Sequence, residues 1–373
     1  MRIRRLLKTL LTAIVILPAA VSGQEKQFEN IEAAELPPWP KLVVMEGHLP
    51  VGYLKTRTHI VEPDGDLRGL PYKTTAGTLV DATAGSIASS VFESTGYIGS
   101  VHCLNGRQIA FPAYAKQGYA VFELDGSWQH RGLGWQLRGG AEHASGRVYS
   151  IPFTPNASKV HWIDSKTLKF GSFSNLRKGT GNKHTWGAVG ANGHVFFLPF
   201  DLPYVEMIHR DDLDKVTRLD TIVTGGENSR SKFTHGVYHR ASKKVVSLSR
   251  RATTTLLIDA DDFAIEEVAM PEELRALYPS GTFSFGCETG PDGWVYSSPW
   301  AHPIVYRFNP ATRQYDWRDF SEQLNHEDVL PKAGHLGNGY CTVMTSMQNP
   351  KGHFEIFYGT GGITKGIKLV FPN

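Results

Sequence analysis

A repeated stretch of sequence constrains the fold of this chain more than any other feature. Four segments each begin with a glycine, continue through an apolar stretch to a proline, and are followed after a short gap by a second apolar stretch. A fifth segment keeps this spacing but lacks the glycine and the proline. The segments are 106–113 with 118–125, 146–153 with 159–164, 193–200 with 204–209, 293–300 with 304–309 and, as the fifth, 244–249 with 255–259.

Each repeat predicts four short strands. The glycine marks a turn, the two apolar stretches are the second and third strands, and a turn containing Asp or Asn leads to the fourth. A short segment upstream of the glycine is the first strand. Proline near the end of the second strand agrees with this, because proline is tolerated where a ladder of hydrogen bonds stops. Four strands in roughly 40–50 residues are typical of one blade of a β-propeller.

The repeats therefore predict an all-β fold, a single β-propeller over residues 41–373, with seven blades preferred over six. Residues 41–80 provide either the seventh blade or one strand that closes the ring. Residues 272–278, which follow Pro271, predict one helical turn. The other six units cover 97–137, 138–180, 181–225, 228–271, 281–322 and 333–371.

Residues 1–23 have the pattern of a secretory signal peptide. Four basic residues between positions 2 and 8 precede a mostly apolar run over 10–20, and small residues precede Gln24. The alternative is an uncleaved membrane anchor, but the run is shorter than the ~20 residues of a membrane-spanning helix. We expect cleavage after Gly23, an extended arm over 24–40, and a secreted or periplasmic protein without a membrane partner.

Composition excludes several functional classes. The chain has 39 basic and 36 acidic residues and a net charge of +3, which is too balanced for a general nucleic-acid binder. Three cysteines argue against a disulfide framework. The sequence has no P-loop, no dinucleotide-binding fingerprint, no nucleophile elbow and no zinc-protease motif. The oligomeric state is left open.

The fifteen histidines are the clearest chemical signal. The first strand of each blade lines the axis of a propeller, so equivalent positions of different blades should meet near one mouth. Among acids, Glu142, Asp201 and Glu288 are expected near that mouth, and no spacing singles out two of them. The equivalent innermost positions are His102, His143, Trp186, His235 and Cys287, with His335 or Cys341 in the last unit.

Two groups of residues can be separated. The first comprises imidazoles and thiols that zinc binds in a tetrahedral shell, although buried thiols and solvated histidines explain them equally well. The second suits an anionic substrate, since Arg holds a carboxylate or sulfate bidentately and His or Tyr moves a proton. A solvated surface turn is the alternative for its two arginines. The first group is His235, His239, Cys287, His335 and Cys341; the second is His143, His161, Tyr238, Arg250 and Arg251, with His184, Tyr204, Arg230 and His302 as candidate substrate-binding residues around it.

The blade motif, the histidine-lined inner strands, the mouth arginine and the His/Cys group together resemble the propeller-type ulvan lyases of polysaccharide lyase families 24 and 25. The resemblance covers most of the mature chain in architecture. It implies that His143 and His161 are the acid–base pair, with Tyr238 as a candidate phenol. Arg250 or Arg251 would neutralise the uronate carboxylate. It also implies a structural zinc held by His235, Cys287 and His335.

The sequence thus predicts a secreted polysaccharide lyase that cleaves a sulfated, uronate-containing glycan by β-elimination. An Arg paired with the uronate carboxylate would stabilise the enolate-like state, and no organic cofactor is needed. Two alternatives stay open. One is a non-catalytic propeller that binds a glycan or a protein, and the other is a metal-dependent hydrolase.

Overall fold

The structure is a computed structural model, and two compact units are distinguished in it, Met1–Pro38 and Trp39–Asn373. The expected signal peptide, 1–23, and most of the expected arm, 24–40, lie outside the residues described. No helix within the described ranges is long and apolar enough to cross a membrane. Those ranges are 36–47, 49, 56–62, 64, 66–71, 76–81, 84, 86–91, 97–112, 118–132, 139–152, 158–174, 183–184, 187–227, 230–324, 329, 341–349, 352–361 and 363–372.

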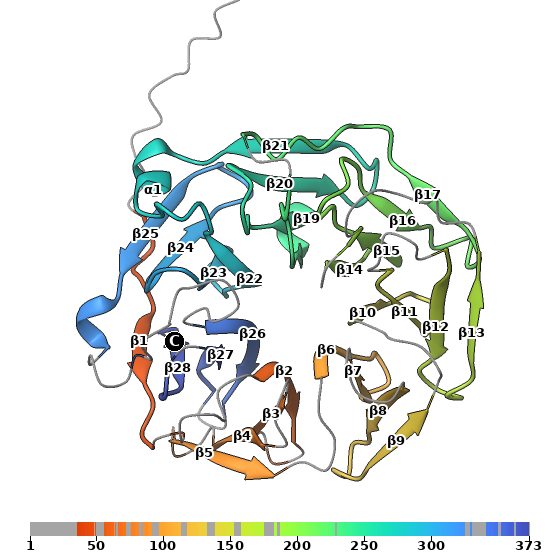
Figure 1. Ribbon diagram of the computed structural model, residues 1–373, viewed down its shortest axis with the longest axis horizontal. Helices are drawn as coiled ribbons and strands as arrows, with labels where there is room; N and C mark the ends of the chain where they lie inside the picture. Colours follow the sequence, from red (N-terminus) through yellow and green to blue (C-terminus); the bar gives the residue numbers. More distant parts are fainter. Residues whose placement is uncertain are drawn as a thin grey trace, which may run out of the picture. The chain divides into compact units, whose positions relative to one another are not determined.

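The unit Trp39–Asn373 is a seven-bladed β-propeller, which confirms the predicted fold (Figure 1). Each blade is an antiparallel sheet of four strands, and neighbouring strands in a sheet follow one another along the chain in all blades but the last. The first strand of each blade lies nearest the centre of the ring.

Blades 1 to 4 follow one another along the chain. They comprise β2 (Thr56–Val61), β3 (Leu67–Pro71), β4 (Ala76–Asp81) and β5 (Ser86–Val91); β6 (Tyr97–His102), β7 (Gln108–Pro112), β8 (Gly118–Phe122) and β9 (Trp128–Gly132); β10 (Gly140–Glu142), β11 (Arg147–Ser150), β12 (Val160–Asp164) and β13 (Phe170–Phe173); and β14 (Ala188–Ala191), β15 (His194–Phe197), β16 (Glu206–Ile208) and β17 (Val216–Arg218).

Blades 5 to 7 complete the ring, and α1 (Glu272–Ala276) falls within the predicted helical turn. The blades comprise β18 (Val237–His239), β19 (Lys244–Ser247), β20 (Thr254–Asp259) and β21 (Ile265–Ala269); β22 (Ser284–Thr289), β23 (Val295–Pro299), β24 (Ile304–Phe308) and β25 (Tyr315–Asp319); and β26 (Cys341–Gln348), β27 (Phe354–Thr360) and β28 (Ile367–Val370) with β1 (Lys41–Val44).

Blade 7 is built from both ends of the unit. The strand β1 pairs antiparallel with β28, with Lys41 opposite Val370 and Val44 opposite Ile367. Both roles considered for residues 41–80 are therefore present, because β1 closes the ring while the segment from Thr56 onwards builds blade 1. That blade extends to Val91, beyond the predicted boundary.

The turns between first and second strands confirm the predicted equivalence of three glycines. Gly146, Gly193 and Gly293 have backbone φ angles of 84°, 85° and 79°. Glycine adopts this left-handed conformation without the steric cost that a Cβ atom brings, which explains why the repeat carries glycine here.

Strand direction defines two sides of the ring. We call the end where the inner strands begin the start side; because the strands are antiparallel, the loops between second and third strands also lie there. We call the end where the inner strands turn into the second strands the turn side.

The core lies between blades: between blades 5 and 6, for example, Val246 and Leu257 pack with Phe285 and Tyr306.

Candidate functional site

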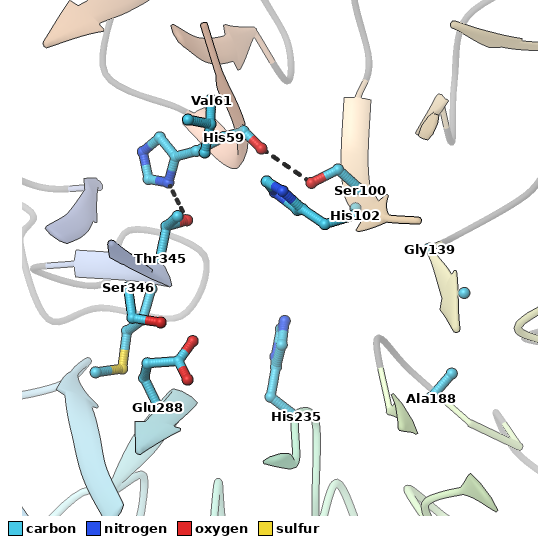
Figure 2. Close-up of a pocket in the computed structure, with 13 residues that line it drawn as sticks. His59, Val61, Ser100, His102, Gly139, Ala188, His235, Glu288, Thr345 and Ser346 are labelled. Carbon is cyan, nitrogen blue, oxygen red and sulfur yellow. Dashed lines mark hydrogen bonds between the residues drawn. The ribbon is translucent and has the colours of Figure 1, made fainter. Parts of the chain in front are cut away.

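The centre of the ring contains a pocket of about 330 Å³, which we call the central pocket. Its volume falls within the range of small-molecule sites in proteins. Its titratable lining residues come from four blades, although they are far apart in the sequence (Figure 2). They are His59, His102, His235 and Glu288.

His59 and His102 are held in the neutral form. Nδ1 of His59 lies 3.0 Å from Oγ1 of Thr345, and the hydroxyl of Ser100 donates to the carbonyl of His59 at 3.0 Å (Figure 2). Burial, together with the neighbouring His102, lowers the pKa of His59 to about 4. Burial also lowers the pKa of His102, although its side chain is partly exposed in the central pocket. Both imidazoles are therefore uncharged at neutral pH.

His235 has a defined tautomer. Its Nδ1 lies 2.8 Å from the carbonyl oxygen of Phe285. A carbonyl only accepts hydrogen bonds, so Nδ1 carries the hydrogen and Nε2 is the basic nitrogen of the neutral ring. The ring points into the central pocket (Figure 2). His235 is thus oriented as a proton acceptor towards this space.

Glu288 is the carboxyl group of the central pocket, and its side chain and that of His235 face the same space (Figure 2). Burial raises its pKa to about 7, although hydrogen bonds from the Thr289 amide, at 3.0 Å, and from Ser346 act in the opposite direction. A carboxyl group with this pKa is about half protonated at neutral pH. It can therefore both donate and accept a proton, as catalytic carboxyl groups do.

A second, larger pocket of about 750 Å³ continues from the first, and we call it the turn-side pocket. It shares Ala188, Glu288 and Ser346 with the central pocket. Its other lining residues follow β18 into the turn at Ala241 and the end of β22 into the turn at Gly293, and include Val189 and Gly190 on β14 and Phe354 on β27. The two pockets together reach from the inner strands to the turn side.

The expected acid–base pair is not brought together. His143 follows β10 rather than beginning an inner strand, and it lies opposite Arg147 on the turn side. His161 lies on β12 beside Ser172, at the start side of the same blade. The correction follows from strand direction, because a residue at the end of a first strand and one at the beginning of a third lie at opposite ends of a sheet.

His143 instead joins two blades. It is 1 % exposed, its Nδ1 accepts from the Ser145 amide at 3.0 Å, and its Nε2 donates to the His209 carbonyl at 3.2 Å. His239 at the end of β18 is built similarly, with Nδ1 accepting from the Ser242 amide at 3.2 Å. Burial lowers the pKa of both imidazoles. Both ring nitrogens of His143 are used within the fold, which is typical of a structural histidine.

Arg250 and Arg251 lie in the loop between β19 and β20, on the start side. The Arg250 guanidinium carbon lies 5.4 Å from the centre of the Phe200 ring, 5.7 Å from that of Phe285 and 5.9 Å from that of Trp300. The backbone amides of both arginines donate to the Lys232 carbonyl, at 2.9 and 3.3 Å. Arg250 is therefore fixed among three aromatic rings of blades 4 and 6. Tyr238 instead lines the turn-side pocket.

Two buried lysines add positive charge near Arg250. Lys183 is 0 % exposed and Lys232 is 1 % exposed, and burial lowers the pKa of both ammonium groups. Their backbones bracket Phe200, whose amide donates to the Lys183 carbonyl and whose carbonyl accepts from the Lys232 amide. We call Lys183, Lys232, Arg250 and Arg251 the start-side basic group.

The four candidate substrate-binding residues all lie on the start side, in loops or just before inner strands, and none is among the described residues that line the central pocket. His184 is fully buried and uses both nitrogens, with the Leu198 carbonyl at 2.6 Å and the Glu206 carboxylate at 2.9 Å. The others are Tyr204, half-buried beneath the Arg218 guanidinium, Arg230, exposed, and His302, edge-on to the Tyr278 ring.

The described residues assemble no zinc site. His235 lines the central pocket, whereas Cys287 is buried among apolar side chains with its Sγ 3.8 Å from the Val246 carbonyl. Burial raises the pKa of this thiol to about 12. No group of three His, Cys, Asp or Glu side chains in the described ranges could hold a metal ion. His335 and Trp186 lie outside those ranges, and the structural zinc stays a prediction.

Sequence reasoning placed His102, His235 and Glu288 near the axis but assigned the proton transfer elsewhere. His59 was missed although blade 1 carries the Gly and Pro spacing of the other blades, with Gly65 six residues before Pro71. That spacing places His59 in the segment before the glycine, which is the first strand of the blade, and it is the signal that could have found it.

No protein-family model matches the chain, and no curated protein matches it. Among solved structures, virginiamycin B lyase from Staphylococcus aureus has a TM-score of 0.64 at 10% identity, over 89% of this chain and 100% of that one. A streptogramin B lyase has a TM-score of 0.63 at 10% identity, over 90% and 100%. A fungal alcohol oxidase in complex with copper has a TM-score of 0.57 at 12% identity, over 90% and 76%. At these identities the similarity shows the propeller fold.

Proposed function

We propose that this protein is a lyase that acts by acid–base β-elimination in the central pocket, with a sulfated, uronate-containing glycan as its substrate. The observation that carries the proposal is the pairing of two proton-transfer groups in one pocket. Glu288 has a pKa raised to about 7, and His235 faces it with a defined basic nitrogen. Active sites are where burial tunes carboxyl groups to this range.

The two groups divide the reaction between them. Nε2 of neutral His235 takes the proton next to the uronate carboxylate, and the electron pair of that C–H bond forms the new double bond. The bond to the leaving oxygen breaks with its electron pair, and protonated Glu288 supplies the proton to that oxygen. The elimination leaves an imidazolium and a carboxylate, and one proton transfer between them restores the starting state. No electron is gained or lost overall.

The substrate class is supported by charge on the start side. Lys232 precedes His235 by three residues, and the Arg250 guanidinium and the His235 ring contact the same Phe285 ring. An anionic substrate approaching the central pocket from this side meets Arg250 and Arg251, the partly exposed members of the start-side basic group, and their charge raises its local concentration. Two of the solved structures with this fold are named lyases, and export by the expected signal peptide would bring the protein to polysaccharides.

The test is a screen of the chain against algal and animal uronate polysaccharides, following the near-ultraviolet absorbance of an unsaturated uronate. The wild type should generate this absorbance and Glu288→Gln should lose at least about 100-fold in rate, as expected for a general acid. Glu322→Gln, an exposed position in the 3-10 turn η2 (Ser321–Gln323), is the matched control. New reducing ends without absorbance would identify a hydrolase, and binding with neither would identify a non-catalytic propeller.

A further inference from the structure

We propose that the turn-side pocket is a substrate subsite that holds the sugar ring beyond the bond that is cleaved, so that the substrate extends past Glu288. This inference rests on the proposed function. It adds a binding site on the opposite side of Glu288 from the start-side basic group, and it assigns the occupant a chemistry: a sugar with an anionic substituent.

The first argument is continuity. Ala188 on β14, Glu288 on β22 and Ser346 on β26 line both pockets, so the acid group lies where the two meet. A substrate whose reacting carbon lies in the central pocket therefore places the group attached to the leaving oxygen beside the turn-side pocket. The volume of about 750 Å³ is within the range of small-molecule sites and exceeds that of the central pocket.

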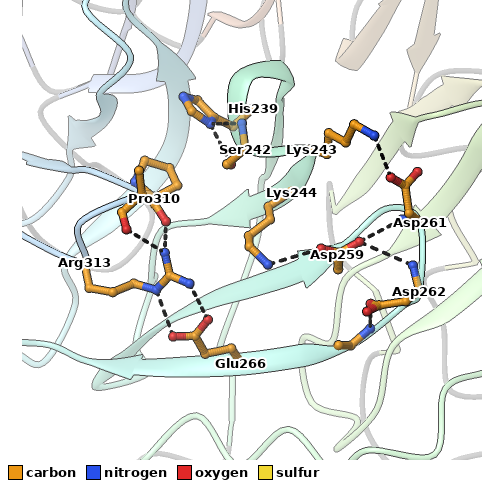
Figure 3. A network of polar contacts seen from close by, with 12 residues as sticks. His239, Ser242, Lys243, Lys244, Asp259, Asp261, Asp262, Glu266, Pro310 and Arg313 are labelled. Carbon is orange, nitrogen blue, oxygen red and sulfur yellow. Dashed lines mark hydrogen bonds and ion pairs between the residues drawn. The ribbon is translucent and has the colours of Figure 1, made fainter. Parts of the chain in front are cut away.

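The second argument is the charge of the lining. Arg240 lines the turn-side pocket and is exposed, and it makes no ion pair with any described residue. Other cations around it are already paired: Lys243 with Asp261 at 2.9 Å, Lys244 with Asp259 at 3.3 Å and Arg313 with Glu266 at 2.7 Å (Figure 3). Among the described residues that line the turn-side pocket, Arg240 is therefore the arginine available to bind a sulfate or carboxylate. Guanidinium groups hold such anions bidentately.

The third argument is that the wall is held in place before a ligand binds. Arg240 and Ala241 belong to the 3-10 turn η1 (Arg240–Ser242). His239 fixes its end through Ser242, whose hydroxyl lies 2.7 Å from Nδ1, and the Lys243–Asp261 pair ties the next residue to the β20–β21 turn (Figure 3). Tyr238 and Phe354 supply aromatic faces to the same pocket. A wall fixed in this way requires little ordering when a sugar binds.

The closed ring adds a consequence for the mode of attack. Because β1 pairs with β28, blade 7 is complete and seven four-stranded blades surround the two pockets. A polysaccharide that extends through both pockets must therefore insert one of its ends. Cleavage should proceed from chain ends, with short products from the first minutes and a slow fall in viscosity.

The experiment places an obstruction in the turn-side pocket. Ala241 is exposed and lines the pocket, so Ala241→Trp should fill part of it without disturbing the core. Ala144, exposed in the corresponding turn of blade 3, provides Ala144→Trp as the matched control. The substrates are a sulfated uronate tetrasaccharide and a 4-O-methyl uronate, whose leaving group is methanol rather than a sugar, and the readout is unsaturated-uronate absorbance.

We expect Ala241→Trp and Arg240→Gln to raise KM for the tetrasaccharide about tenfold while kcat changes less than twofold, because uniform binding is lost. Neither should affect the 4-O-methyl uronate, because it has no sugar beyond the cleaved bond, and Ala144→Trp should match the wild type. Wild-type KM values for the tetrasaccharide in both variants, or random early fragments from the polymer, would overturn the subsite while leaving the lyase proposal intact.

A calorimetric titration separates the subsite from the chemistry. If no variant and no wild-type chain produces unsaturated uronate, the lyase proposal fails, and the saturated tetrasaccharide is then titrated into wild type, Ala241→Trp and Ala144→Trp. Binding weakened about tenfold in Ala241→Trp alone would still support the subsite. Equal binding by all three, or binding by none, would overturn it.

Discussion

His235 and Arg250 both contact Phe285, although His235 lines the central pocket and Arg250 lies in a start-side loop. The His235 ring centre lies 5.5 Å from that of Phe285, and the Arg250 guanidinium carbon lies 5.7 Å from the same ring. Backbone bonds reinforce the contact, since the Phe285 carbonyl binds His235 Nδ1 and the Arg250 carbonyl accepts from the Phe283 amide at 2.7 Å. The orientation of His235 therefore depends on the segment that Arg250 holds.

The first prediction follows from this arrangement and concerns Arg250→Lys. An ammonium keeps the charge but loses the planar group that stacks on three rings, so both stability and turnover should fall. We expect a free energy of unfolding lower by about 1–2 kcal/mol, from lost packing and cation–π contacts. The kcat should fall more than the KM rises, because His235 is less well oriented.

Arg230→Lys is the control for Arg250→Lys, because Arg230 is exposed on the same side of the ring. Denaturant unfolding and steady-state kinetics measure the two effects. An Arg250→Lys variant as stable and as active as Arg230→Lys would contradict the coupling to His235.

The second prediction concerns the pH dependence of stability at Glu288. Its pKa in the folded protein, about 7, lies above the ordinary 4.5, so between these values the folded state binds more protons than the unfolded state. Stability from this group is therefore complete below pH 4.5 and is lost as the pH rises through 7. Glu288→Gln, which stays neutral, should be equal to wild type near pH 4 and more stable at pH 8.

Thermal unfolding at pH 4, 6 and 8 measures this difference, with Glu322→Gln as the exposed control. In the same range, wild-type turnover should fall as the pH rises above about 7, because the protonated carboxyl is the acid. A Glu288→Gln variant that is less stable than wild type at pH 8 would contradict this prediction. It would show that the surroundings of Glu288 stabilise its ionised form instead of destabilising it through burial.

The fold could be predicted because its determinants are local. Gly146, Gly193 and Gly293 occupy left-handed turns that only a few residues tolerate, so each one marks the same point of a blade. The candidate site depended on quantities that local patterns do not contain. His143 was assigned to the beginning of a strand when it follows one, and this error moves its side chain to the other side of the ring. The raised pKa of Glu288 arises from burial by several blades, and no motif encodes it.

The third prediction tests whether His143 is structural rather than catalytic. It is buried, and its two nitrogens join the turn after β10 to the His209 carbonyl of blade 4. His143→Ala leaves these partners without a hydrogen bond and should cost about 1–3 kcal/mol of stability, while kcat changes less than twofold. His161→Ala, half-buried on the start side of the same blade, is the comparison. If His143→Ala lost turnover while keeping the wild-type free energy of unfolding, His143 would be a catalytic residue.

The last prediction concerns Trp39, which fastens the closing strand of the ring. Its Nε1 donates to the Asp316 carboxylate at 2.6 Å, and the buried Arg307 guanidinium lies between the Trp39 and Trp294 rings, 4.7 and 4.6 Å from their centres. Because β1 begins two residues later, these contacts hold β1 in blade 7 from the side of blade 6.

Trp39→Ala should lower the free energy of unfolding by about 2–3 kcal/mol, since large aromatic truncations cost this much or more. Trp39→Phe, which keeps a ring for Arg307 but cannot donate to Asp316, should recover roughly half of the loss, and Trp128→Ala on the outer strand β9 is the control. Denaturant unfolding compares the four proteins; equal midpoints for Trp39→Ala and Trp128→Ala would mean that pairing of β1 with β28 closes the ring without Trp39.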